Sequence, residues 1–110
     1  MTAPFVQSVR ARREAIRVDG ADGVHGRQLS LRVEVPEIWD VVKVLAPESA
    51  PVLAVKESVL RRLIPGADEL HYVMKLRGWE VLDEGLSLAD VGAIDGSIFL
   101  LTHRRRRPVR

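Results

Sequence analysis

The chain has 110 residues, of which 29% are charged and 46% hydrophobic, a size and composition typical of one soluble globular domain. A domain this small builds one modest core and leaves few residues for an enclosed active site. The absence of cysteine excludes disulfides, thiol chemistry and thiolate metal sites. No apolar run approaches the ~20 residues needed to cross a bilayer, and the N-terminus lacks the apolar core of a secretory signal, so we expect a cytoplasmic protein.

The formal net charge is only +2, but the basic residues are unevenly distributed. Arginines crowd both ends of the chain, whereas acids and bases are mixed between them. We therefore expect basic arms on a near-neutral body. The arginines at the two ends are Arg10, Arg12, Arg13 and Arg17, and then Arg104, Arg105, Arg106, Arg107 and Arg110.

Residues 1–28 carry weak structural signals. The segment from Asp19 to Gly23 breaks any regular element. We expect a basic, flexible extension over residues 1–28. The specific alternative is a strand over residues 15–18 that pairs as a hairpin with residues 29–35.

Ordered structure is predicted from Leu29. Apolar and polar residues alternate over residues 29–35, the period of a half-buried strand. Pro36 ends this strand because proline lacks a donor for the ladder. A second, valine-rich strand is predicted over residues 39–45, and Trp39 is expected to close the end of the sheet.

A helix is predicted next, with Ser49 accepting a hydrogen bond from its first free amides. Pro65 and Gly66 end it. Spacings of three and four gather one apolar helical face. The residues on that face are Val52, Val55, Val59 and Leu63.

Three more strands are predicted. The first covers residues 69–76, with its apolar face formed by Leu70, Tyr72, Met74 and Leu76. After a turn at Gly78, residues 79–82 form a short edge strand and residues 86–90 a single helical turn. Asp95 and Gly96 form a further turn. The apolar run at residues 97–101 is typical of a strand in the centre of a sheet, here parallel to the first strand.

This order of elements predicts a two-layer α+β domain, with a four- to five-stranded mixed sheet packed on one helix. Two segments resemble the ubiquitin-like family. Residues 42–63 have the second strand, a Pro-Glu-Ser loop and the helix valines, and residues 82–100 have an acidic turn, Ser-Leu-x-Asp, a glycine turn and the final strand. The resemblance implies a ubiquitin-like β-grasp domain at residues 29–103, followed by a basic tail at residues 104–110.

Protein modifiers of this family end in two glycines, and this sequence departs from that pattern. Arg106, Arg107 and Pro108 stand in the corresponding region, and no two glycines are adjacent anywhere. We therefore expect no conjugation. The resemblance is closest in kind to small bacterial ubiquitin-like proteins associated with type VII secretion, which also lack the glycine pair, and the high arginine, alanine and valine content fits a GC-rich bacterial genome.

The resemblance also implies a recognition patch on the outer face of the sheet. Alternation places His71, Val73 and Lys75 there, provided that the turn at Gly78 holds one extra residue, because the other register would bury Lys75. Trp79 has two interpretations. It either anchors an interface or covers the edge of the core, and the second is about twice as frequent for such a residue.

The arginine run either keeps the end of the chain solvated or contacts an acidic partner, nucleic acid or a lipid surface. No aromatic residue interleaves with it, so any nucleic-acid binding is expected to be non-specific. The run consists of Arg104, Arg105, Arg106 and Arg107.

No constellation in the sequence indicates catalysis, a cofactor or a metal. His25, His71 and His103 are widely separated, the adjacent Asp83 and Glu84 fit a turn, and Ser87 fits the start of a helical turn. We expect a non-catalytic protein-interaction module in a bacterial secretion or regulatory assembly. The alternatives are a modifier whose conjugation does not use a terminal glycine pair, and a non-specific nucleic-acid-binding accessory protein.

Overall fold

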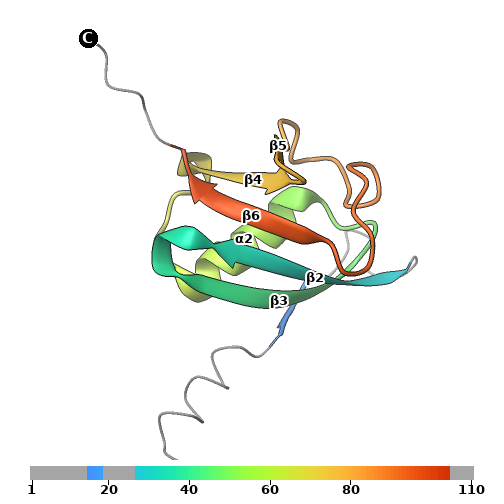
Figure 1. Cartoon of the computed structure of the whole chain (residues 1–110), viewed down its shortest axis with the longest axis horizontal. Coiled ribbons are helices and arrows are strands. Elements are labelled where there is room, and N and C mark those ends of the chain that lie inside the picture. The colour runs from blue at the N-terminus through green and yellow to red at the C-terminus, as the bar shows by residue number, and fades with distance from the viewer. Residues whose placement is uncertain (1–14, 19–26, 105–110) are drawn as a thin grey trace, which may run out of the picture.

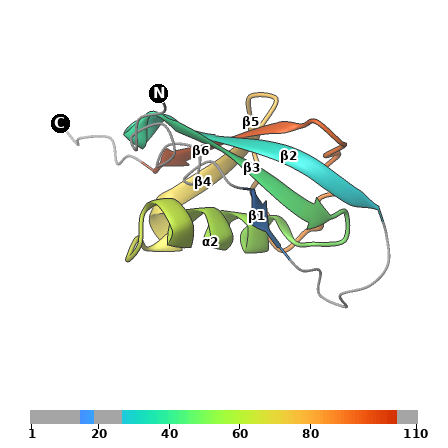
Figure 2. The ribbon, with the colours of Figure 1, turned by 90° about the horizontal axis from the view of Figure 1, so that it is seen from below.

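The computed structural model describes residues 15–18 and 27–104. In this part of the chain, six strands form one mixed sheet, and the helix α2 (Val52–Leu63) lies across one of its faces (Figures 1 and 2). The strand order is β1-β3-β2-β6-β4-β5. The strands are β1 (Ile16–Arg17), β2 (Gln28–Val35), β3 (Asp40–Pro47), β4 (Tyr72–Leu76), β5 (Trp79–Glu80) and β6 (Ile98–His103).

The predicted α+β architecture is confirmed, with six strands in place of four or five. The first predicted strand is β2, which forms an antiparallel hairpin with β3. Leu31, Val33 and Val35 are buried toward α2, whereas Arg32 is exposed, so the period-two pattern reports the true faces of the strand.

The connection between β2 and β3 is the short 3-10 helix η1 (Pro36–Ile38), and Trp39 follows it. The backbone N–H of Trp39 donates to the Pro36 carbonyl oxygen at 3.0 Å, which holds Trp39 in the left-handed region with a φ of 55°. Its side chain is 93% exposed. The prediction that Trp39 closes the end of the sheet is therefore wrong, because this backbone conformation turns the side chain into solvent.

The last strand, β6, lies between β2 and β4 (Figure 1). It runs parallel to β2 and antiparallel to β4. Phe99 and Leu101 are fully buried against the helix side of the sheet. The predicted central, parallel position of this strand is confirmed.

The helix α2 buries Val52, Val55 and Val59, as its spacing predicts. Its N-cap is Pro51, without a side-chain cap, so the assignment of Ser49 as the cap is wrong. The first free amides instead find carbonyl oxygens in the loop before the last strand. Leu53 N donates to Glu84 O at 2.8 Å, and Val52 N donates to Leu86 O at 3.0 Å.

The third predicted strand begins later than expected. Asp68 accepts a hydrogen bond from Leu70 N at 3.0 Å, which caps a second 3-10 helix, η2 (Glu69–His71), before β4 begins. Leu70, predicted to face the core, is consequently 72% exposed. Met74 and Leu76 are buried and Lys75 lies on the opposite face, so the predicted register of β4 is confirmed.

Arg77 and Gly78 join β4 to the short edge strand β5, and both have positive φ values, 55° and 84°. Two such residues match the type I′ turn, whose twist suits a tight hairpin. After β5, Ser87 Oγ accepts from Asp90 N at 3.0 Å and Asp90 Oδ2 accepts from Ser87 N at 3.3 Å. This reciprocal pair starts the single predicted turn, in which Val91 N donates to Ser87 O.

Residues 15–18 add an outer strand to the sheet. Ile16 and Val18 are buried in the core, and β1 pairs in parallel with β3. The alternative of a strand here is confirmed, but its predicted hairpin partner is wrong. The second edge of β2 is occupied by β6, so within the β2–β3 hairpin only β3 has an edge to which β1 can add. Residues 1–14 and 19–26, the rest of the predicted extension before Arg27, lie outside the described residues.

Candidate functional site

The face of the sheet that points away from α2, called here the outer sheet face, is not covered by any described element (Figure 2). Cross-strand pairing sets which residues are neighbours there. Arg32 lies between Lys43 and Ile98, and Glu34 lies between Val41 and Leu100. Residues on this face are Arg17, Arg32, Glu34, Val41, Lys43, Leu45, Val73, Lys75, Glu80, Ile98, Leu100 and Thr102.

Four cations from four strands stand on the outer sheet face: Arg17, Arg32, Lys43 and Lys75. None of them forms an ion pair with another described residue. The two ion pairs among the described residues are Lys56–Glu84 and Arg104–Glu80. The acids of this face are Glu34 and Glu80, and Glu80 is paired with Arg104. The face therefore carries an excess of unneutralised positive charge.

Apolar side chains occupy the middle of the same face. Ile98 and Leu100 lie on the central strand β6, where Ile98 is exposed and Leu100 is half-buried. Val41 is also exposed and lies on β3, across Glu34 from Leu100. None of the described strand residues on this face is aromatic. The surface thus combines a small apolar centre with cations around it.

The three residues predicted for the recognition patch fall in different environments. Lys75 is half-buried on the outer sheet face beside Leu100. Val73 is on the same face but only 5% exposed, so it offers a partner little surface, contrary to the expectation of an outward contact. His71 is exposed, but it ends η2 before the strand begins. The predicted patch does not include Arg32 and Lys43, although the alternation of their strands places both side chains outward.

Arg104 is fixed at the end of β6. Its backbone N–H donates to the His71 carbonyl oxygen at 2.6 Å, and its Nη2 lies 3.4 Å from Glu80 Oε2. The His71 and His103 rings lie nearby, with centroids 6.0 Å apart. The arginine run is thus anchored by its first member at the margin of the outer sheet face, while Arg105, Arg106 and Arg107 lie outside the described residues.

Tyr72 ties β4 to η1 at this end of the sheet. Its hydroxyl donates to Glu37 Oε1 at 3.0 Å. Burial, followed by the hydrogen bond to Glu37 and its charge, raises the pKa of the Tyr72 phenol. The phenol therefore remains a hydrogen-bond donor throughout the neutral range.

Trp79 is 79% exposed, which excludes the interpretation that it covers the edge of the core. It lines a groove of about 480 Å³ together with Leu82, which is 85% exposed. We call this hollow the Trp79 groove. Its lining residues are Leu76, Arg77, Trp79, Glu80, Val81, Leu82, Asp83, Leu86 and Val91.

A buried lysine fixes one wall of the Trp79 groove. Lys56 Nζ lies 2.6 Å from Glu84 Oε1 and donates to the Tyr72 carbonyl oxygen at 2.9 Å. The residue follows Val55 on α2 and is almost inaccessible to solvent. The turn at residues 83–85 is consequently tied to both the helix and the start of β4.

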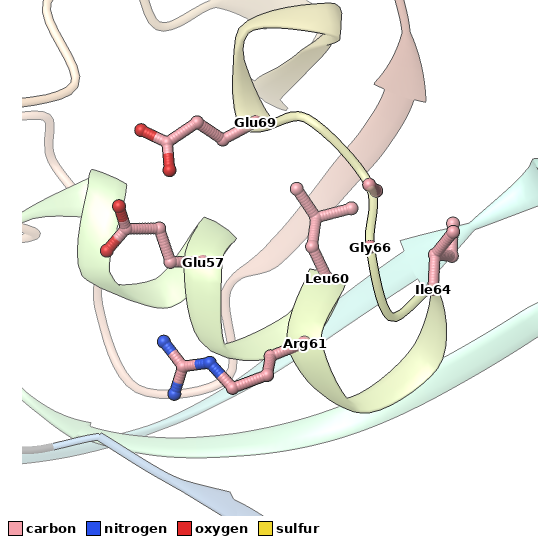
Figure 3. A pocket seen from close by; sticks show the side chains of 7 residues that line it. Glu57, Leu60, Arg61, Ile64, Gly66 and Glu69 are labelled. Atoms are coloured by element: carbon pink, nitrogen blue, oxygen red, sulfur yellow. The ribbon is translucent and has the colours of Figure 1, made fainter.

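A second hollow lies between the C-terminal half of α2 and η2 (Figure 3). Glu57 and Glu69 project into it from these two elements, with Arg61 one turn further along the helix. The hydrogen bond to Glu57, followed by desolvation and the charge of Glu57, raises the pKa of the Glu69 carboxyl.

Among residues 15–18 and 27–104, no group of three histidine, cysteine, aspartate or glutamate side chains is placed to hold a metal ion. No helix in the same part of the chain is long and apolar enough to cross a membrane.

No known protein family and no curated protein matches this sequence. Solved structures match its fold. The C-terminal ubiquitin-like domain of mouse tubulin-specific chaperone e gives a TM-score of 0.65 at 18% identity, over 82% of this chain and 100% of that one. A ubiquitin-like domain of an Arabidopsis thaliana protein gives 0.64 at 13% identity, over 82% and 92%. Caldiarchaeum subterraneum ubiquitin gives 0.62 at 16% identity, over 74% and 100%.

These likenesses extend over most of both chains, and they agree with the mixed sheet, the central parallel β6 and the single helix described above. At identities of this level they establish the architecture. The chain has a ubiquitin-like β-grasp fold.

Proposed function

We propose that this domain is a non-catalytic protein-interaction module whose outer sheet face binds an acidic segment of a partner protein. The observation that carries the proposal is the set of four cations without ion-pair partners in the described structure, placed around a partly exposed apolar centre. Partner carboxylates would neutralise the cations, and Val41 and Ile98 would supply apolar contact area.

The composition of this surface favours a protein over a nucleic acid as the partner. Phosphate backbones also attract lysine and arginine, but single strands need aromatic platforms for their bases. The described residues of the outer sheet face include none. Apolar side chains such as Val41 and Ile98 have no favourable contact on a phosphate backbone, whereas they match the apolar residues of a protein segment.

We propose a cytoplasmic setting for this module, within a bacterial secretion or regulatory assembly. The support is the resemblance of residues 42–63 and 82–100 to small bacterial ubiquitin-like proteins associated with type VII secretion. The high content of arginine, alanine and valine agrees with it.

The test uses a pool of labelled peptides in which glutamate alternates with leucine, isoleucine or valine. We expect amide chemical-shift changes to cluster on β2, β3 and β6. The double variant Arg32→Glu/Lys43→Glu should weaken binding about tenfold at low salt, because two attractive charges become repulsive. Arg61→Glu reverses one charge on the opposite side of the sheet, so it is the matched control for each single variant, Arg32→Glu and Lys43→Glu, and should bind like the wild type.

Two results would contradict the proposal. One is equal weakening by Arg61→Glu and by the single variants Arg32→Glu and Lys43→Glu, since that reports net charge and not a site. The other is binding of random-sequence DNA at least as tight as that of the peptides, which would favour the nucleic-acid alternative.

A further inference from the structure

We infer that the Trp79 groove is a second binding surface, and that it takes a basic segment of a partner protein carrying one bulky apolar side chain. The groove belongs to the β4–β5 hairpin and the loop after it, so it is built from other residues than the cations of the outer sheet face. The inference therefore goes beyond the proposed binding of an acidic partner.

The apolar part of the argument is the exposure of two large side chains. Trp79 and Leu82 are 79% and 85% exposed, and they lie along one hollow of about 480 Å³. Single exposed apolar residues need no explanation, but two that line a shared concavity match the usual form of an anchor site. A tryptophan in such a place is among the residues that contribute most to protein interfaces.

The charge around the groove specifies the partner. The stretch from residue 79 to residue 97 contains no lysine or arginine, and its acids are Glu80, Asp83, Glu84, Asp90 and Asp95. Glu84 is neutralised by Lys56, and Glu80 by Arg104.

Asp83 lines the groove and Asp90 precedes Val91, another lining residue; neither forms an ion pair with a described residue. Each accepts a backbone hydrogen bond, from Gly85 N and from Ser87 N respectively, and keeps its charge facing solvent. Arg77 is also a lining residue, and its guanidinium donates to the Gly92 carbonyl oxygen at 3.4 Å. That bond to a neutral oxygen leaves its positive charge in place, so Arg77 offsets one of the two carboxylates and the unpaired charge around the groove remains negative by one.

An acidic rim beside an exposed indole fits a partner arginine or lysine. The cation can lie over the face of Trp79 while it pairs with Asp83, and the neighbouring apolar side chain of the partner enters beside Leu82. An acidic segment would meet unpaired carboxylates instead, so the groove and the outer sheet face select opposite partner charges.

The groove is already formed in the free domain. The Lys56–Glu84 ion pair and the hydrogen bond from Leu53 N to Glu84 O hold one wall, and the Arg77–Gly78 turn sets the other. Binding therefore orders little of the domain, which reduces the entropic cost of association.

The test uses fluorescein-labelled eight-residue peptides in which lysine or arginine alternates with leucine or phenylalanine, and a second pool with glutamate at the charged positions. In a Trp39→Phe background, Trp79 is the only tryptophan, so its emission reports occupancy of the groove. We expect the basic pool to bind about tenfold or more tightly than the acidic pool, and Trp79→Ala to weaken it about tenfold.

Asp83→Asn keeps the side-chain acceptor for Gly85 N while it removes the charge. We expect about threefold weaker binding at low salt and no difference from the parent at high salt. Arg32→Glu/Lys43→Glu is the matched control and should leave binding of the basic pool intact. This control separates the inference about the groove, tested with the basic peptides, from the proposal about the outer sheet face, tested with the acidic peptides.

Equal binding of the two pools, or full binding after Trp79→Ala, would overturn the inference. Sedimentation without peptide supplies one more discriminating result. Self-association that is lost on Trp79→Ala would mean that the groove binds a second copy of this chain, which would overturn the assignment to a separate partner.

Discussion

Lys56 is a charged residue in the core, and the free-energy cost of burying its charge depends on two neighbours. Its ammonium is close to Glu84 Oε1 and donates to the Tyr72 carbonyl oxygen. Transfer of an ammonium ion out of water is costly, and only the paired geometry offsets it. Loss of the partner charge is therefore more damaging than loss of the whole pair.

We predict that Glu84→Gln lowers the free energy of unfolding by about 3 kcal/mol, because it leaves a buried charge without its counter-ion. Lys56→Met, which fills a similar volume without a charge, should cost clearly less. Urea denaturation of both variants gives the comparison. A larger loss in Lys56→Met than in Glu84→Gln would mean that the ion pair stabilises the fold beyond its desolvation cost.

The carboxyl pair in Figure 3 gives a prediction about pH. The pKa of Glu69 is raised in the folded state, so the folded protein binds this proton more tightly than the unfolded chain does. The resulting stability is present at low pH and is lost as the pH rises through the folded pKa. Glu69→Gln should therefore raise the melting temperature at neutral pH, with the gain shrinking as the pH falls into the carboxyl range.

Thermal melts at about pH 7 and about pH 3.5, on either side of the ordinary carboxyl pKa, check this dependence. Glu57→Gln removes the other member of the pair and should give the same sign. The double variant should add little to either single change, because both relieve one shared repulsion. A gain that is equal at the two pH values would refute the assignment.

At the scale of elements, η1 is followed by Trp39 in a backbone conformation that is energetically unfavourable for a tryptophan. Trp39 has a φ of 55° and an almost fully exposed side chain. Left-handed backbone is unfavourable for residues with a bulky side chain and is better tolerated by asparagine.

We predict that Trp39→Asn raises the free energy of unfolding by up to about 1 kcal/mol, since it relieves backbone strain and removes no packing. Chemical denaturation measures the change. Val41→Asn, an exposed position in the neighbouring strand with ordinary extended backbone, should show no gain. Destabilisation by Trp39→Asn would show that the indole packs against the domain in solution.

The strand β1 gives a prediction about the N-terminal segment. Ile16 is buried against the core, whereas its neighbour Arg17 is exposed. Ile16→Ala should lower the free energy of unfolding by about 2 kcal/mol, near the lower limit for buried isoleucine because the strand lies at an edge of the sheet. Arg17→Ala is the matched control and should change stability by less than about 0.5 kcal/mol. Equal effects of the two changes would place residues 15–18 outside the cooperative fold.

Periodicity predicted most of these elements because each buries one face. The alternation in β2, the three- and four-residue spacing in α2 and the apolar run of β6 are direct consequences of burial. It failed where individual hydrogen bonds, local or long-range, decided the conformation. Asp68 caps η2 and thereby delays β4, and the carbonyl oxygens of Glu84 and Leu86 replace Ser49 at the start of α2. Such contacts join residues that periodicity does not relate.

At the scale of the whole molecule, the domain presents two surfaces of opposite character. The outer sheet face carries four cations without ion-pair partners, and the lining of the Trp79 groove contains two acids, Glu80 and Asp83, and one cation, Arg77. Their combination suits a module that holds two different segments at once, because neither surface attracts the segment that fits the other. Peptides of opposite charge should therefore bind independently, without competition, in a titration with both pools present.

The site could be predicted from the sequence only in part. Lys75 faces outward, as alternation predicts, and Trp79 is exposed and does not cover the edge of the core. Its role as an interface anchor stays a prediction. The burial of Val73 was not predictable, because it depends on neighbours contributed by other strands. Likewise, the grouping of Arg17, Arg32 and Lys43 follows only from the strand order, which brings distant segments together.

That strand order has a consequence for synthesis on the ribosome. Until β6 has left the exit tunnel, β2 and β4 lack the neighbour that separates them, and each has an unsatisfied backbone edge. The nascent chain can form the β2–β3 hairpin and α2 early, but the sheet closes only when almost the whole domain has been translated. Chains that stall before Ile98 would therefore be prone to pair with one another along those two open edges.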